Sequence, residues 1–552
     1  MATQQEPALI LQQFITSGCV KFQTTHPAEF HKRIFETCAK LGVTDSGNGT
    51  PLCEVLGDDM LPEMPELTQL FECPNVREAL EAILGPNPIL DPHRFCHLAV
   101  QGRRAQAMHM DGYQSTGVRA IQARAHRPTW ILAMYYPQEV TDDMGPTAVV
   151  PGSHYLHLDD PRGQAMNFAR VGEQDIPAVV SEWGMKEEEV LCPAGTLVLC
   201  HYDAWHRATS SSSPNMRFMV KFIFSRGQLP TPTDVAPDPP VPWDAVPLPK
   251  QLRCVWETVW AWAHGAPLPS LDGGDGDPPG GGEVERVAWA YRAGAAVREG
   301  RRPATDLTKM LRAGEEPRAR LATEGLSWGG EAAAKVLIPL LTEALPDHKR
   351  ATAAYALGWA GGGELGDAAL TQAAGQGPTM TRVHALQGML GRPSAADAAM
   401  AGLRCRAGEV QANAARLLAA QPTAVVGQAQ DKLQDIVQNA SRDHTLRYAV
   451  AFAAEALFRS EARPWQLMLQ YSPFGHGFGT QAPRKDFRPT SERAWAAWIN
   501  SENGRQNQAK FGGPVDIPPE ASRFLPAGLP AANDEGRPAQ DGKRRRWASR
   551  RG

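Results

Sequence analysis

The strongest constraint on the fold is a Pro- and Gly-rich stretch, residues 229–283, which separates two parts of the chain with different textures. It reads LPTPTDVAPDPPVPWDAVPLP and later LDGGDGDPPGGGE. Such a composition buries too little apolar surface to offset the entropy of ordering it, so we expect a flexible linker with one short aromatic helix at 255–263. Because 552 residues are also too many for one core, we expect two to four domains.

Residues 1–228 combine helical and β-prone segments. Helical spacing of apolar residues predicts helices at 6–15, 28–41 and 75–84, and a strand is expected at 18–22. Further on, Gly, Pro and Ser interrupt short β-prone runs at 95–100, 129–136, 148–150, 195–200, 205–208 and 218–224. Short strands at this density predict a double-stranded β-helix, or jelly roll, with flanking helices, in which strands distant in sequence lie side by side.

Residues 284–462 are rich in Ala and Leu and predict an all-α domain. Helices are expected at 285–298, 330–345, 349–359, 379–390, 409–420, 424–438 and 443–458. A repeat of about 32 residues fits the intervals from Arg350 to Arg382 and from Asp347 to Asp443. Small residues at close-contact positions favour tightly paired helices, so we expect a HEAT-like α-solenoid that binds a protein partner.

The last segment, residues 463–552, is expected to be an extended and largely disordered tail. It is polar and Pro-rich towards its end, and it closes with the basic cluster Lys543-Arg544-Arg545-Arg546. A basic cluster in a tail is usually a solvated segment, and a nuclear import signal is the alternative interpretation.

The sequence His109-Met110-Asp111 is the first candidate for chemistry. On an extended segment, side chains two residues apart point to the same side, so His109 and Asp111 supply two of the three ligands of a 2-His-1-carboxylate facial triad. That triad holds non-heme Fe(II) and leaves coordination positions open. The pattern alone is weak, because His-x-Asp also occurs at 157–159 and 201–203. A distant histidine must supply the third ligand.

The segment 195–222 contains the candidates for that third ligand. Gly195 begins a predicted strand that ends near His201, a break follows, and His206 comes next. A Ser-rich loop then leads into a strand that begins with Arg217. His206 and Arg217 are therefore expected on adjacent strands.

With these elements in order, residues 10–226 resemble the phytanoyl-CoA dioxygenase (PhyH) family of Fe(II)/2-oxoglutarate oxygenases. The matching elements are His109-x-Asp111, the segment Met144-Gly145-Pro146 to Pro151-Gly152-Ser153-His154, His206, and Arg217 after Asn215. His201 is a weaker candidate than His206, because it closes a strand and lacks the Asn-x-Arg sequel at the family's spacing. The resemblance does not extend beyond residue 226.

The resemblance implies that His109, Asp111 and His206 bind iron and that Arg217 pairs with the distal carboxylate of 2-oxoglutarate. These residue types suit the roles, because imidazole and carboxylate bind Fe(II) and a guanidinium fork binds a carboxylate in bidentate fashion. The implied reaction is hydroxylation of an unactivated C–H bond of a small molecule, such as an acyl or amino-acid-derived compound, with O2 as oxidant and ascorbate as reductant. Decarboxylation of 2-oxoglutarate to succinate accompanies it. Related halogenases lack the carboxylate, so Asp111 favours hydroxylation.

Several residues have both a functional and a structural interpretation. Gln101, Gln106, Thr129 and Trp130 are candidates for the 2-oxoglutarate pocket and are equally explained by packing or solvent exposure. The pair Arg103-Arg104 suits an anionic substrate or simply a solvated surface. His154 is expected to shape a turn, His157 and Asp159 to be incidental, and Trp359 and His384 to pack in the helical part.

Composition excludes some classes of protein. A net charge of −4 gives no reason to expect nucleic acid, and no apolar run reaches the roughly 20 residues of a membrane helix. Nine scattered cysteines without a CxxC pair or a secretory leader predict free thiols and an intracellular, cytoplasmic location. Two alternatives to an oxygenase stay open: a catalytically silent oxygenase-like domain in a HEAT-repeat scaffold, and zinc-dependent hydrolysis at the same ligands.

Overall fold

A computed structural model describes residues 6–43, 64–110, 126–156, 176–313 and 316–422, with 425, 428, 429 and 432. Several sequence predictions therefore lie wholly or largely outside the described residues: the carboxylate Asp111, the helices at 424–438 and 443–458, and the tail from 463. The pair His157 and Asp159 lies outside them as well. Among the residues that are described, no helix is long and apolar enough to cross a membrane.

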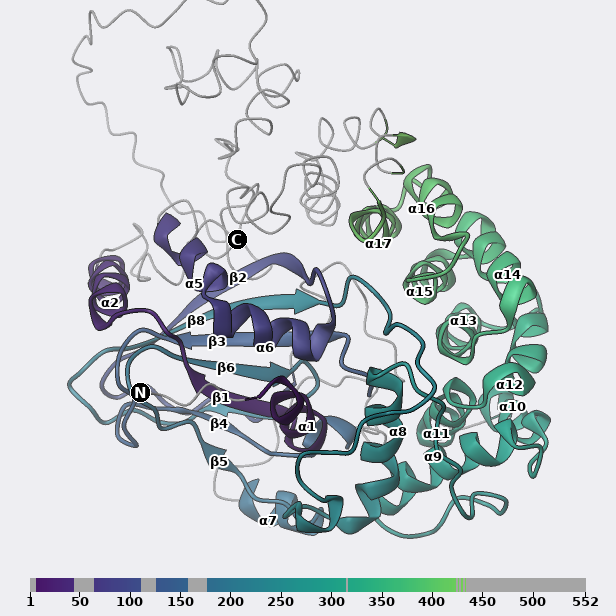
Figure 1. The fold of residues 1–552 in the computed structure, drawn as a ribbon, viewed down its shortest axis with the longest axis horizontal. Coiled ribbons are helices and arrows are strands. Elements are labelled where there is room, and N and C mark those ends of the chain that lie inside the picture. Colours follow the sequence, from purple (N-terminus) through teal and green to yellow (C-terminus); the bar gives the residue numbers. More distant parts are fainter. Residues whose placement is uncertain are drawn as a thin grey trace, which may run out of the picture.

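The N-terminal part is built around two antiparallel sheets (Figure 1). The strands are β1 (Cys19–Gln23), β2 (Ile89–Ala99), β3 (Trp130–Tyr136), β4 (Thr147–Val149), β5 (Glu188–Glu189), β6 (Thr196–His201), β7 (His206–Ala208) and β8 (Arg217–Ser225). The larger sheet has the order β1-β6-β3-β8-β2 and the smaller one β5-β4-β7. Strands distant in sequence thus lie side by side, which is the arrangement that the sequence predicts for this part.

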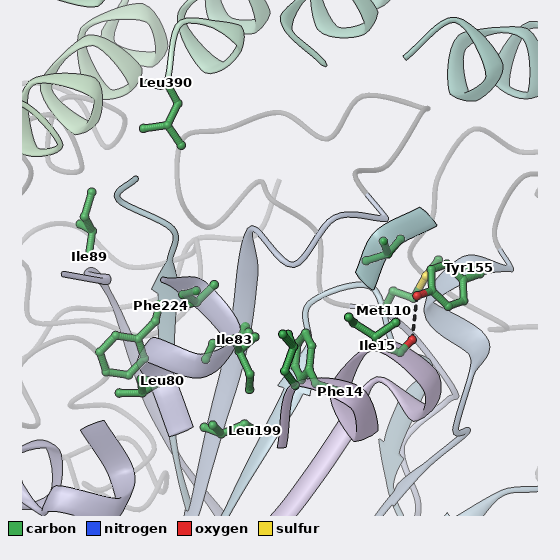
Figure 2. Packing of buried hydrophobic residues seen from close by; sticks show 14 of the residues in the cluster. Phe14, Ile15, Leu80, Ile83, Ile89, Met110, Tyr155, Leu199, Phe224 and Leu390 are labelled. Carbon is green, nitrogen blue, oxygen red and sulfur yellow. Dashed lines mark hydrogen bonds between the residues drawn. The ribbon is translucent and has the colours of Figure 1, made fainter. Parts of the chain in front are cut away.

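The two central strands, β3 and β8, are buried along their whole length because both faces of the large sheet are covered. One face packs on helices α1 (Pro7–Ser17) and α6 (Pro74–Leu84), and Figure 2 shows Phe14 and Ile83 among the side chains of this core. The other face points between the sheets and forms a second cluster that includes Leu132. Three further helices flank the sheets: α2 (Ala28–Val43), α5 (Thr68–Glu72) and α7 (Ile176–Glu182).

The prediction of free thiols is wrong for one pair of cysteines. Cys19 and Cys200 lie directly opposite each other on the neighbouring strands β1 and β6, and they form a disulfide. Local sequence spacing gives no sign of this pairing, because the two strands come together only in the folded sheet. The remaining described cysteines carry free thiols: Cys38, Cys73, Cys96, Cys192, Cys254 and Cys405.

The Pro- and Gly-rich stretch, for which the sequence predicts flexibility, is packed against the rest of the chain. It contains α8 (Arg253–Ala263), and three of its tryptophans are buried: Trp243, Trp256 and Trp260. Its Gly-rich end is held by Arg302, whose guanidinium donates to the carbonyl oxygens of Gly274 and Gly276 at 2.7 Å each. Composition alone misses these anchors, because the aromatic side chains and the arginine supply the contacts that glycine and proline lack.

The C-terminal part is a curved array of helices, here called the helical array. It comprises α9 (Glu283–Arg298), α10 (Ala304–Ala313), α11 (Glu316–Ser327), α12 (Gly330–Leu337), α13 (Asp347–Ala360), α14 (Gly363–Gln376), α15 (Thr379–Gly388), α16 (Ala395–Leu403) and α17 (Gly408–Ala419). In Figure 1 the odd-numbered helices form the inner layer, nearer the sheets, and the even-numbered helices form the outer one. The helical character of this part matches the prediction, although α10, α11, α14 and α16 were not predicted.

The inner face of the helical array packs against the chain's own sheets. On α17, Arg416 donates from Nε to Ser225 Oγ at 3.3 Å, and its guanidinium lies 4.5 Å from the ring centroid of Trp130. Ser225 ends β8 and pairs with Trp130 at the start of β3. A single apolar core runs from Ile10 in α1 to Leu418 in α17. The surface on which the sequence predicts a protein partner is therefore covered, on this side, by the N-terminal part.

A buried charged cluster lies at this contact, around Glu324 of α11. Trp328 Nε1 donates to Glu324 Oε1 at 2.7 Å, and His126 Nδ1 lies 3.4 Å from the same oxygen. Burial raises the pKa of Glu324 to about 7, although the nearby Arg127 guanidinium opposes that shift. Burial also lowers the pKa of His126 well below its ordinary value. The neighbouring phenols belong to Tyr155, Tyr291 and Tyr355.

We expect Glu324→Gln to change how stability depends on pH. The folded chain keeps a proton on Glu324 that the unfolded chain releases between pH 4.5 and about 7, so the free energy of unfolding falls as pH rises through that window. The loss is on the order of 3 kcal/mol. His126 acts with the opposite sign and lies 3.4 Å from Glu324, so the difference between wild type and variant reports Glu324 together with its effect on His126. Urea unfolding across this window measures it, and parallel profiles would contradict the prediction.

Candidate functional site

The structure brings His109 and His206 together although they are far apart in sequence. They form an antiparallel bridge in which the His109 amide donates to the His206 carbonyl oxygen at 3.0 Å and the His206 amide donates back at 2.9 Å. Their ring centroids are 4.6 Å apart. His206 is the first residue of β7 and is buried, whereas His109 is half-buried. Two imidazoles thus lie side by side at one point of the small sheet's edge.

Both rings are oriented by the backbone of their own segments. His109 Nδ1 lies 2.8 Å from the carbonyl oxygen of Ala107, and His206 Nδ1 lies 3.0 Å from that of Ala204. A carbonyl oxygen only accepts, so each Nδ1 is the donor, and in the neutral ring this leaves Nε2 as the nitrogen that can bind a metal. This is the tautomer and the type of supporting bond that metal-binding histidines have.

Asp111, the predicted carboxylate ligand, lies outside the described residues. Within the described part of the chain, no group of three or more His, Cys, Asp or Glu side chains has the geometry of a metal site. The structure therefore describes two of the three predicted ligands, and the role of Asp111 stays a prediction.

Arg217, the predicted carboxylate partner, is buried at the start of β8. One of its terminal nitrogens donates to the carbonyl oxygen of Gly145, and its Nε is buried without a hydrogen-bond partner among the described residues. Burial lowers the pKa of its guanidinium, and the nearby Arg103 lowers it further. A buried cation with an unsatisfied donor is costly to maintain, which is typical of an anion-binding position.

Gly145 explains part of the Met144-Gly145-Pro146 motif. Its φ of 67° lies in the left-handed region, and a Cβ there would come within 3.0 Å of the carbonyl oxygen of Thr209. Glycine is the residue that fits both conditions. The motif thereby presents a carbonyl oxygen to Arg217.

His109, His206 and Arg217 line one cavity of about 290 Å³. The full lining consists of Phe95, His97, Arg103, Gln106, His109, Met134, Thr147, His206, Arg207, Ala208, Arg217, Met219 and Lys221. Among these described residues the charged side chains are all cationic. Arg207 is neutralised by a bidentate ion pair with Glu187, with N–O distances of 2.6 and 3.0 Å. A lining that holds cationic side chains and, among the described residues, no carboxylate suits an anionic ligand.

Eight of these residues were not singled out in the sequence, namely Phe95, His97, Met134, Thr147, Arg207, Ala208, Met219 and Lys221. A signal for two of them was present. Side chains alternate along a strand, so Met219 and Lys221 share the face of Arg217 on β8. The registers Ala99↔Arg217 and His97↔Met219 extend the same face to β2. That register does not follow from the sequence.

The four open pocket candidates have structural roles, and only Gln106 also lines the cavity. Gln101 donates to the Ser212 carbonyl oxygen at 3.2 Å, and Gln106 accepts from the Ala208 amide at 3.1 Å. The Thr129 carbonyl oxygen accepts from the Arg226 amide, and Trp130 lies under Arg416 of the helical array. For Arg103 the sequence allows either contact with an anionic substrate or a solvated surface position, and in the structure this residue lines the cavity.

The competing histidines lie away from the cavity lining. His154 is in the short 3-10 helix at Ser153–Tyr155, is fully buried, and has its ring centroid 4.7 Å from that of His201. His201 Nδ1 accepts from the Asp203 amide at 3.1 Å, which caps the turn between β6 and β7. The positions agree with structural roles for both. In the helical array, His384 is buried with Nδ1 2.8 Å from Gln387 Oε1.

One family model matches the chain. It is described as Phytanoyl-CoA dioxygenase (PhyH), and it matches residues 53–219. This stretch contains all four predicted site residues: His109, Asp111, His206 and Arg217. No curated protein matches the chain at a significant level.

Several solved structures are similar over part of the chain. A non-heme monooxygenase, the ThoJ–Ni complex, is 16% identical and covers 40% of this chain and 77% of its own, with a TM-score of 0.30. The epimerase SnoN in complex with Fe3+, alpha ketoglutarate and nogalamycin RO is 19% identical, with coverages of 44% and 94% and a TM-score of 0.31. EctD from S. alaskensis with 2-oxoglutarate and 5-hydroxyectoine is 14% identical, with coverages of 41% and 79% and a TM-score of 0.31.

Proposed function

We propose that this protein is an Fe(II)- and 2-oxoglutarate-dependent dioxygenase that hydroxylates a small molecule. One observation carries the proposal: two histidines in the metal-binding tautomer face the same cavity as a buried arginine with an unsatisfied donor. The match of residues 53–219 to the PhyH family model supports the same activity. The iron ligands would be His109, Asp111 and His206.

The donor set fits the cofactor and the co-substrate. Neutral imidazoles are suitable ligands for Fe(II), and the carbonyl bonds at Ala107 and Ala204 hold their lone pairs in place. Arg217 would receive the distal carboxylate of 2-oxoglutarate, which satisfies its buried Nε and compensates its charge. The cationic lining of the cavity would further attract this dianion.

When bound, Fe(II) and 2-oxoglutarate supply the oxidation: the substrate C–H bond becomes C–OH while O2 is consumed and 2-oxoglutarate is converted to succinate and CO2. The chain's own residues orient the reactants. Arg217 fixes one end of the co-substrate, and Phe95, Met134 and Met219 supply an apolar wall that limits water.

The test is succinate formation by the purified full chain with Fe(II), 2-oxoglutarate, ascorbate and O2. We expect turnover that disappears when iron, 2-oxoglutarate or O2 is omitted, and a rise in Tm on adding metal with 2-oxoglutarate. A chain that binds no Fe(II) and shows no such rise in Tm would refute the proposal. Hydrolysis that continues without O2 would support the zinc alternative instead.

The helical array would be a HEAT-like solenoid in this proposal. Its alternate helices stack in two layers, which is the arrangement of such repeats. Any protein partner would use the outer layer, because the inner one lies against the sheets.

A further inference from the structure

One contact between the helical array and the sheet-containing part is made by a short segment, residues 126–130. Arg127 inserts into the array, where its guanidinium carbon lies 3.4 Å from the ring centroid of Trp328 and 4.7 Å from that of Trp359. Trp262 of α8 is 5.8 Å away. Arg127 also donates to the carbonyl oxygen of Ser327 at 2.9 Å. An arginine of the sheet-containing part is thus enclosed by an aromatic cage of the helical part.

Burying the Arg127 guanidinium at this contact costs free energy, which the surrounding side chains must offset. Arg127 is only 2% exposed, and burial lowers its pKa to about 10. The cage compensates through cation–π attraction, which is strongest when the cation is shielded from water. Arg416 makes a second contact of the same kind over Trp130. The two arginines therefore attach the array to the segment that begins β3.

The start of β3 is connected to His206 by backbone hydrogen bonds. The Trp130 carbonyl oxygen accepts from the Tyr202 amide at 3.3 Å, which ties β3 to the turn between β6 and β7. That turn contains Ala204, whose amide donates to the His201 carbonyl oxygen at 2.9 Å. The Ala204 carbonyl oxygen in turn orients the His206 ring. A displacement of Trp130 would therefore shift the turn at 202–204, and with it the carbonyl oxygen that orients the His206 ring.

We propose that Arg127 and Arg416 are positioning residues that let the helical array hold the His206 ring in its metal-binding orientation. The array is then a working part of the oxygenase through its inner face. This inference rests on the proposed function, because it assigns the metal role to His206. Arg217 lies at the opposite end of β8 from Ser225, so its binding of 2-oxoglutarate is outside the reach of these contacts.

The test uses full-length Arg127→Met, Arg127→Lys and Arg416→Met, with Arg312→Met as the control. Arg312 is an exposed arginine of α10 that pairs with Glu343. We expect Arg127→Met to weaken Co(II) and Fe(II) binding by about 10- to 100-fold, as loss of an outer support of a metal ligand does. At saturating metal its KM for 2-oxoglutarate stays within about threefold of wild type, and Arg127→Lys recovers part of the affinity because it keeps the cation.

Hydrogen exchange gives a readout that is independent of metal. The amides of Tyr202, Ala204 and His206 should exchange faster in Arg127→Met than in the control, while those of β1 should not. Folded variants with wild-type metal affinity and wild-type exchange would overturn the inference. Should Arg127→Met fail to fold, wild-type metal affinity together with wild-type exchange in Arg416→Met overturns it equally. A wild-type chain that binds no metal refutes the proposed function instead. The exchange data then still show whether the Arg127 contact stabilises the backbone around His206.

Discussion

Replacing His206 with alanine should lower 2-oxoglutarate turnover by at least about 1,000-fold, because the metal contributes several kcal/mol of transition-state stabilisation and is lost with its ligand. His206 is 7% exposed, so removing its ring opens a small space next to the bridge with His109. His109→Ala should behave alike. Metal content after dialysis and succinate release measure the effect.

The control for these variants is His348→Ala, which removes an exposed histidine from α13. It should keep wild-type metal content and turnover. A His206→Ala chain that retains Fe(II) and turns over 2-oxoglutarate at more than about a tenth of the wild-type rate would remove His206 from the ligand set. His201 would then have to be reconsidered, although its Nδ1 already accepts from the Asp203 amide.

The second large effect is expected at Arg217, in KM for 2-oxoglutarate. A hydrogen bond to a charged group is worth about 1.5–3 kcal/mol, so Arg217→Met should raise KM by roughly 10- to 150-fold. Arg217→Lys should be impaired less, since it keeps the charge but loses the planar fork. Initial rates at saturating metal measure KM, and metal affinity should stay near that of wild type.

Arg77→Ala is a suitable control, since Arg77 is an exposed arginine of α6 that forms an ion pair with Glu81 one helical turn away. It should leave KM unchanged. Because Arg217 also donates to Gly145, Tm must be measured for each variant. An unaltered KM in a folded Arg217→Met chain would place the co-substrate carboxylate elsewhere in the cavity, with Arg103 and Lys221 as the next candidates.

Helices and strands were predicted well where the segment itself contains residues that mark its ends or its buried face. Gly195, at φ 85°, begins the strand that the run after it predicts, and the apolar spacing of residues 28–41 matches α2. Helices such as α14 and α16 were missed because they contain glycine and polar residues on faces that only the neighbouring helices define. Their stability comes from packing, which spacing does not report.

The order of the site residues along the sequence was enough to propose them, but the residues that surround them in the fold could not be predicted. His109, His206 and Arg217 could be proposed from the resemblance to a family, and the structure brings them to one cavity. The contribution of His97 depends on the register of β2 against β8, and the cage around Arg127 depends on contacts between residues 200 positions apart, such as Arg127 and Ser327. Long-range pairing of this kind leaves no local pattern in a single sequence.

The shared core has a consequence for how such a chain can change over time. Because side chains from Ile10 to Leu418 belong to one packed interior, a change of volume on the array side has to be matched on the sheet side. Trp328 and Arg127 form such a matched pair, and Trp130 and Arg416 another. The N-terminal part and the helical array are therefore expected to evolve together. Neither can be replaced by the corresponding part of another protein unless the contacting residues on the other side are replaced as well.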